Sequence, residues 1–263
     1  MRFLQIYVIV KGMIKRLTIS EEDKKHIAGA EINPSDLADD FFDYGRVVIK
    51  KPWGQEYLVY KNDYTAAWIL NINKGFRTSM HCHPSKKTTL FVLSGTVKCP
   101  TLQGAETLSK GQGFLIDKGV FHATEAVSDN VVILETETPT NKKDLVRLHD
   151  HYGRQGQGYE GSEFHERLDP AMPHFHKHNE RYHHGKQFGD SHVSVVRYQN
   201  DYFLKGALPF LDADVACAVK GSFYDQDNKC IIEVGDIFIW KDFKNRNDFR
   251  CDGESEFLLI KTI

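Results

Sequence analysis

The sequence of 263 residues has no excess of basic side chains and no closely spaced pair of cysteines. Its 34 basic and 36 acidic side chains give a formal net charge of −2, which argues against a surface that binds nucleic acid through phosphate contacts. The five cysteines are odd in number and form no C-x-x-C pair, so they indicate reduced thiols in a cytoplasmic protein rather than a disulfide framework. They are Cys82, Cys99, Cys217, Cys230 and Cys251.

A long apolar run is also missing at the N-terminus. The stretch from Met1 to Val10 ends at Lys11, far short of the roughly 20 residues that span a bilayer. It has neither the basic start nor the small-residue cleavage site of a signal peptide. We therefore expect no membrane partner, and both Met1 and Met13 remain candidates for the natural start.

The N-terminal segment, 1–46, is expected to contain short helices. Ser20 is a capping residue followed by three acidic residues, a pattern typical of a first helical turn. A second short helix is predicted from Pro34 toward Phe42.

Two histidines lie one residue apart in the stretch from Gly75 to His83. Side chains alternate along a β-strand, so His81 and His83 point to the same face. His122 on a returning strand completes a cluster of three imidazoles, which suits a divalent ion such as Zn, Fe, Mn, Ni or Co. The alternative is that these histidines are structural or merely line a polar pocket.

Short strand-like runs separated by turn residues fill the region 47–140 and predict an all-β, antiparallel barrel or sandwich. The runs are 47–50, 56–60, 65–73, 78–83, 89–98, 112–116 and 130–136.

These motifs resemble the paired motifs of the cupin superfamily. Gly75, His81, His83 and Gly95 fit the first motif, and Gly111, Gly119 and His122 fit the second. The resemblance implies a cupin-type antiparallel jelly roll with a metal site. The glutamate that is usually a ligand in this family falls on Thr88, whose neutral hydroxyl is a poor ligand. The expected site is therefore His81, His83, His122 and water.

The second half, 191–263, repeats the first in weakened form and predicts a second, degenerate cupin barrel. Gly95 and Gly111 have counterparts in Gly221 and Gly235, within similar local sequences. The positions that correspond to His81 and His83 hold Ala207 and Pro209, so no metal site is expected there.

A polar, histidine-rich linker, 141–190, is predicted between the two halves. Its densest part runs from His174 to His178, with His183 and His184 shortly after. Such a cluster indicates either a second metal site or lid, or a solvated linker that binds metal only adventitiously.

A finer resemblance covers residues 47–155. The phrase Pro52-Trp53-Gly54, the first cupin motif and the stretch from Leu145 to Arg154 look like bacterial cupins called mannose-6-phosphate-isomerase-like. This resemblance says little about the substrate, because one fold supports many functions.

The leading hypothesis is a metal-dependent isomerase or epimerase of a sugar phosphate or nucleotide sugar. Glu125 is the candidate base, unless it is a solvated strand-end residue. Lys86 or Lys87 is the candidate phosphate ligand, unless the pair forms an ordinary charged turn. Two other functions stay open: a three-histidine iron dioxygenase, and a non-catalytic sugar-binding or scaffold protein. Exposed barrel edges further predict a homodimer.

Overall fold

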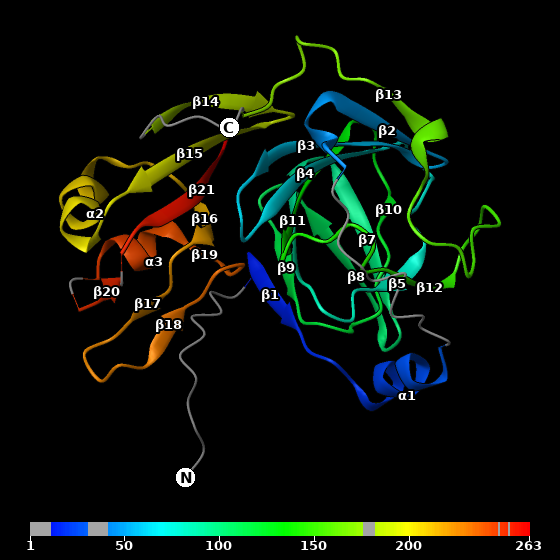
Figure 1. Ribbon diagram of the computed structural model, residues 1–263, viewed down its shortest axis with the longest axis horizontal. Helices are drawn as coiled ribbons and strands as arrows, with labels where there is room; N and C mark the ends of the chain where they lie inside the picture. Colours follow the sequence, from blue (N-terminus) through cyan, green and yellow to red (C-terminus); the bar gives the residue numbers. More distant parts are fainter. Residues whose placement is uncertain (1–11, 31–41, 176–181, 247, 252) are drawn as a thin grey trace.

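The protein consists of two β-units that lie side by side (Figure 1). This computed structural model describes residues 12–30, 42–175, 182–246, 248–251 and 253–263. The first unit is built on an eight-stranded sheet with the order β1-β9-β6-β11-β4-β3-β2-β13. Its strands are β1 (Ile14–Leu17), β2 (Val47–Lys51), β3 (Gly54–Lys61), β4 (Ala66–Ile72), β6 (Lys87–Ser94), β9 (Gly113–Ile116), β11 (Val131–Thr138) and β13 (His165–Arg167).

Two smaller sheets complete the first unit as a jelly-roll barrel. One has the order β10-β7-β8 and the other pairs β12 with β5. Their strands are β5 (Met80–Cys82), β7 (Thr96–Thr101), β8 (Gly104–Ser109), β10 (Glu125–Ala126) and β12 (Val146–His149). A cluster of buried apolar side chains from the large sheet and from β7, β8 and β10 fills the barrel. This is the all-β, cupin-type architecture expected from the sequence.

The second unit repeats the strand order of the first. Its five-stranded sheet, β14-β15-β21-β16-β19, corresponds to β3-β4-β11-β6-β9, and its three-stranded sheet, β18-β17-β20, corresponds to β8-β7-β10. The strands are β14 (Tyr182–Phe188), β15 (Ser191–Tyr198), β16 (Val215–Lys220), β17 (Phe223–Tyr224), β18 (Cys230–Ile232), β19 (Ile237–Ile239), β20 (Arg250–Cys251) and β21 (Ser255–Thr262).

Each unit contains the same kind of glycine turn. Gly111 donates its backbone N–H to Val92 (3.0 Å), and Gly235 donates to Ala218 (2.7 Å). Both glycines have positive φ, 85° and 88°, a conformation that favours glycine. The match in strand order and turn geometry agrees with the internal repeat seen in the sequence.

The units differ where the first carries its histidines. Between β4 and β6 the first unit has β5, whereas between β15 and β16 the second has α2 (Asp201–Ala207) followed by the short helix η4 (Leu208–Phe210). After β19 comes another helix, α3 (Trp240–Lys244). Ala207 and Pro209 thus lie in helical structure.

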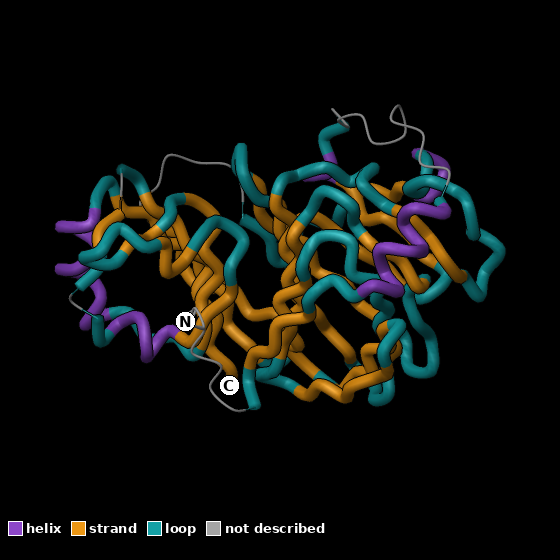
Figure 2. Tube along the Cα trace, turned by 90° about the horizontal axis from the view of Figure 1, so that it is seen from below, coloured by secondary structure: helices purple, strands orange, loops and turns teal. Residues whose placement is uncertain are grey.

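The two large sheets pack face to face through one apolar cluster that includes side chains of both units. Val59, Phe91 and Leu134 contribute from the first unit, and Val215 and Leu258 from the second. Figure 2 shows the strands of both units in the middle of the molecule and helices toward its two ends. The two halves therefore bury part of their apolar surface against each other.

Several local expectations are modified by the structure. The helix predicted after Ser20 is confirmed as α1 (Glu21–Gly29), whereas the one predicted from Pro34 lies largely outside the described residues. The segment 1–46 also contains the strand β1, and the run 89–98 is divided between β6 and β7. The segment 141–190, predicted as a linker, contains β12 and β13, which pair with β5 and β2 of the barrel, and also β14, so the second unit begins before residue 191. Among the described residues, no helix is long and apolar enough to cross a membrane.

Candidate metal centre

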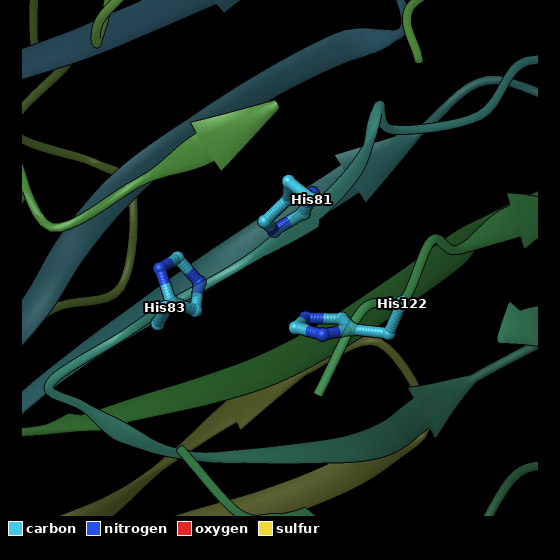
Figure 3. A group of neighbouring side chains, drawn as sticks. All are labelled: His81, His83 and His122. Atoms are coloured by element: carbon cyan, nitrogen blue, oxygen red, sulfur yellow. The ribbon is translucent and has the colours of Figure 1, made fainter. Parts of the chain in front are cut away.

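The three predicted histidines come together inside the first unit (Figure 3). His81 and His83 belong to β5 or follow it directly, and His122 precedes β10. The backbones of His81 and His122 exchange two hydrogen bonds, of 3.0 and 2.9 Å, which fix the two segments in antiparallel register. Their ring centroids are 4.6 Å apart, and the ring of His83 lies 5.1 Å from that of His81.

Each imidazole is oriented by a backbone carbonyl. A carbonyl oxygen only accepts, so each Nδ1 carries a proton and donates it, and each Nε2 presents a lone pair. The acceptors are the carbonyl oxygens of Ser79 for His81 (2.8 Å), Asp144 for His83 (2.5 Å) and Val120 for His122 (2.9 Å). One ligand atom from each ring lies within 4.8 Å of the other two, and the buried Nε2 of His83 has no partner among the described residues. Three neutral imidazoles with ligand atoms this close together fit a divalent ion.

The surroundings keep all three rings neutral, as metal binding requires. Burial lowers the pKa of His81 and His83 well below the usual value, helped by His122 at His81 and by Lys86 at His83. Burial also lowers the pKa of His122, to about 4. Lone pairs are therefore available at neutral pH without the cost of removing a proton.

Thr88, at the position of the family's glutamate, faces the interior of the barrel. It is buried on β6, and its hydroxyl oxygen has no partner within the described part of the chain. Leu90, two residues further along, packs in the apolar cluster inside the barrel, as alternation requires. A glutamate here would reach the interior, but the threonine leaves that position without a carboxylate.

Two carboxylates that the sequence analysis did not select lie beside the histidines. Glu135 and Glu137 on β11 point inward, and their oxygens and a ring nitrogen of His83 all lie within 4.8 Å of one another. Glu137 is directly opposite Thr88 across the two strands. In the sequence Glu135-Thr136-Glu137 the two glutamates are two positions apart, and this alternation predicts that both side chains lie on one face of a strand.

The two carboxylates differ in their partners. Glu137 accepts from Lys86 (2.8 Å) and lies 3.5 Å from Lys142. Burial alone would raise the pKa of Glu137, but Lys142 and Lys86 outweigh it and hold the pKa below its usual range. Glu135 has no hydrogen bond or ion pair with any described residue, and burial raises the pKa of its carboxyl to about 7.

A ring of buried charges surrounds the centre. Lys142 is 3.2 Å from Glu56 and lies 3.8 Å above the ring of Trp68. The Tyr159 hydroxyl donates to Glu56, and Glu160 pairs with Lys51. Each of these charges has an opposite charge or a hydrogen-bond donor beside it, so the site is preorganised.

The space at the centre is small, but a larger cavity adjoins it. The cavity that includes His81, His83 and Glu135 has a volume of about 50 Å³. A second cavity of about 520 Å³ shares Glu137 and Lys142 with it. The first is large enough for an ion and a few small atoms, whereas the second lies in the size range of small-molecule sites.

The other predicted site residues have different surroundings. Lys86 is buried and ion-paired with Glu137, beside the histidines. Lys87 lies on the opposite face of β6, where it contacts Glu233 (2.8 Å) and Asp236 (2.9 Å) of the second unit. It is thus neither part of a charged surface turn nor directed toward the histidines.

Glu125 also faces away from the centre. Its neighbour Ala126 packs in the apolar cluster inside the barrel, so the Glu125 side chain points to the other side of β10. The reason is that Glu125 lies three positions after His122, and in an extended chain side chains an odd number of positions apart point to opposite faces. The structure therefore gives no support to Glu125 as the base.

The histidine cluster of the second predicted site is only partly described. His174 donates from Nδ1 to the carbonyl oxygen of Met172 (2.7 Å), while His176 and His178 lie outside the described residues. The side chains of His183 and His184 are outside them too.

Comparison with known proteins gives weak structural likenesses. No protein-family model and no curated protein matches the chain. KdgF from Halomonas sp. is similar at 18% identity and a TM-score of 0.34, covering 42% of this chain and 94% of its own. An RmlC-like cupin from Shewanella frigidimarina has 17% identity and a TM-score of 0.34, over 40% and 95% of the two chains. A cupin-superfamily sugar phosphate isomerase from Silicibacter pomeroyi has 15% identity and a TM-score of 0.31, over 33% and 59%. Likenesses this low carry no argument about function.

Proposed function

We propose that this chain is a divalent-metal enzyme that isomerises or epimerises a sugar derivative, such as a sugar phosphate or a nucleotide sugar. The observation that carries the proposal is the orientation of the three imidazoles. Each donates Nδ1–H to a backbone carbonyl, which leaves Nε2 free to bind a metal, and a ring nitrogen of each lies within 4.8 Å of one on each of the other two. Structural histidines have no need of three such nitrogens close together in a buried space.

His81, His83 and His122 would hold the ion, which supplies Lewis acidity toward oxygen atoms of a bound carbonyl or hydroxyl compound. Isomerisation and epimerisation also require a group that moves a proton. We assign this role to Glu137, because Lys86 and Lys142 keep its carboxylate ionised and fix its position. Glu137 lines both cavities, so it lies between the histidines and the space that would receive a substrate.

The first experiment is elemental analysis of the purified protein, followed by alanine substitution of each histidine. Each substitution should remove most of the metal and leave the fold intact, because the ion is not needed to form a core of this size. Metal that persists in all three variants would place the ion elsewhere.

The second experiment tests turnover. The protein loaded with Zn, Mn, Co, Ni or Fe is incubated with hexose phosphates, pentose phosphates and nucleotide sugars. For a substrate that is converted, Glu137→Gln should lower kcat about 10²–10⁴-fold while the metal is retained. Full metal occupancy without turnover of any of these compounds contradicts the proposal. Oxygen uptake by the iron-loaded protein would instead identify a dioxygenase.

A further inference from the structure

We infer that Glu135 is the carboxylate ligand of this metal centre, and that β11 thereby supplies the acidic side chain which β6 lacks at Thr88. The inference rests on the metal site of the proposed function, but not on its substrate or reaction. It assigns different roles to the two carboxylates of β11, one to the ion and the other to proton transfer.

The strand register allows this exchange. Glu137 lies opposite Thr88, and Glu135 lies opposite Leu90, one inward-facing position further along. Side chains at opposite and diagonal positions of paired strands are within reach of each other when one of them is long. A carboxylate on β11 can therefore reach the region that a glutamate at Thr88 would occupy.

The partners of the two carboxylates determine which of them is available. Glu137 is engaged by Lys86 at 2.8 Å, and the Lys86 side chain is fully buried, so it requires this counter-ion. Glu135 has no hydrogen bond or ion pair within the described part of the chain, although only 7% of its surface is exposed. A buried carboxylate without a partner is costly, and a cation beside His83 would supply the missing charge.

The second unit provides a comparison within the same chain. In β11, Glu135 lies opposite Leu90, and in β21 the equivalent position is Leu259, opposite Ala216. Leu259 packs in the apolar core of its unit. The unit without the histidine strand thus has a leucine at this position, whereas the unit with the histidines has a glutamate. The acidic side chain and the imidazoles occur together.

The test measures metal affinity directly, independently of any activity. Apo full-length protein is titrated with cobalt(II) or zinc alone in competition with a chelator of known affinity. Glu135→Gln should raise the Kd by at least about tenfold, because even groups that only orient metal ligands contribute 10–100-fold. The visible spectrum of the cobalt form should change as well. Glu166→Gln, at an exposed glutamate of β13, is the matched control and should leave both unchanged.

A second variant tests whether the position of the carboxylate matters. Thr88→Glu in the Glu135→Gln background should restore most of the lost affinity, because it returns the carboxylate to β6. Melting of the metal-free variants verifies that each one folds. An unchanged Kd and cobalt spectrum in Glu135→Gln, together with metal loss in the histidine variants, would show that the histidines hold the ion without a carboxylate. Failure of every form to bind metal would overturn the proposed function itself.

Discussion

The buried imidazoles of His81, His83 and His122 make the metal-free protein sensitive to acid. The rings of His81, His83 and His122 are neutral because protonation would place charge inside the barrel, where no described carboxylate contacts their Nε2 atoms. In the unfolded chain the same rings are solvated and titrate near pH 6.5. Acid therefore favours the unfolded state.

The first prediction concerns this pH dependence. The pKa of His122 is about 4 in the folded protein, so the unfolded chain binds more protons between pH 6.5 and 4. As the pH decreases through this window, His122 should remove up to about 3 kcal/mol from the free energy of unfolding of the apo protein. Glu135, whose pKa burial raises to about 7, binds protons more readily in the folded state and offsets part of this loss. Urea denaturation in the presence of a chelator measures it. His122→Gln should show a shallower dependence, and identical slopes would contradict the assigned burial.

The alternation of side chains along a strand also explains which site residues could be predicted from the sequence. The sequence predicts that His81 and His83 share a face because they are two positions apart, and the same rule places Glu125, three positions after His122, on the opposite face. Glu135 and Glu137 also satisfy this rule, but both follow the two cupin-like motifs in the sequence, so the motifs do not indicate them. The partners of Lys86 and Lys87 could not be predicted, because Glu137 and Asp236 are distant in sequence.

Helix α1 supports the segment that carries His122. Ser20 is the N-cap of this helix, and the buried Asp23 completes the capping box by accepting from the backbone N–H (2.8 Å) and the hydroxyl (2.6 Å) of Ser20. Its other oxygen accepts from the backbone N–H of Phe121 at 2.9 Å. Gly119 has a positive φ of 79°, a conformation that favours glycine, and it lies against the Ile27 side chain of α1.

The second prediction is that Asp23→Ala destabilises both α1 and the segment that carries His122. It removes the N3 carboxylate of the capping box and leaves a buried N–H beside His122 without its acceptor, which should lower the free energy of unfolding by about 1–3 kcal/mol. Metal binding should weaken as well, since Phe121 directly precedes a ligand. Glu22→Gln, an exposed change in the same helical turn, is the control. Unchanged metal affinity would show that α1 does not position His122.

The sequence predicted α1 from local chemistry, since a capping serine and acidic first turn require no tertiary contact. It did not predict β1, because Ile14–Leu17 pairs in parallel with β9, about 100 residues away in sequence. Replacement of β5 by α2 in the second unit was likewise not visible in the repeat, since only the glycine turns and their flanking strands retain similarity.

One apolar cluster and the ion pairs of Lys87 join the two units. Lys87 lies between Glu233 and Asp236, with most of its side chain buried. One face of the large sheet of each unit is thus covered by the other unit, and β1 pairs with the edge of β9. The predicted homodimer stays a prediction; it would have to use other surfaces, and light scattering at micromolar concentration tests it.

The shared cluster leads to the last prediction, that both units unfold in one cooperative transition. Of the three tryptophans, Trp53 and Trp68 belong to the first unit and Trp240 to the second. In a Trp53→Phe/Trp68→Phe variant, fluorescence therefore reports the second unit alone. Cobalt absorbance reports the histidine centre of the first unit in the same sample. Separation of either unit would expose the large apolar face that now joins them, so the two signals should change at the same urea concentration. Calorimetry supplies a check that needs no metal, since a two-state protein gives equal calorimetric and van't Hoff enthalpies. Loss of the Trp240 signal at a lower urea concentration than the cobalt signal would mean that the units fold independently despite their shared core.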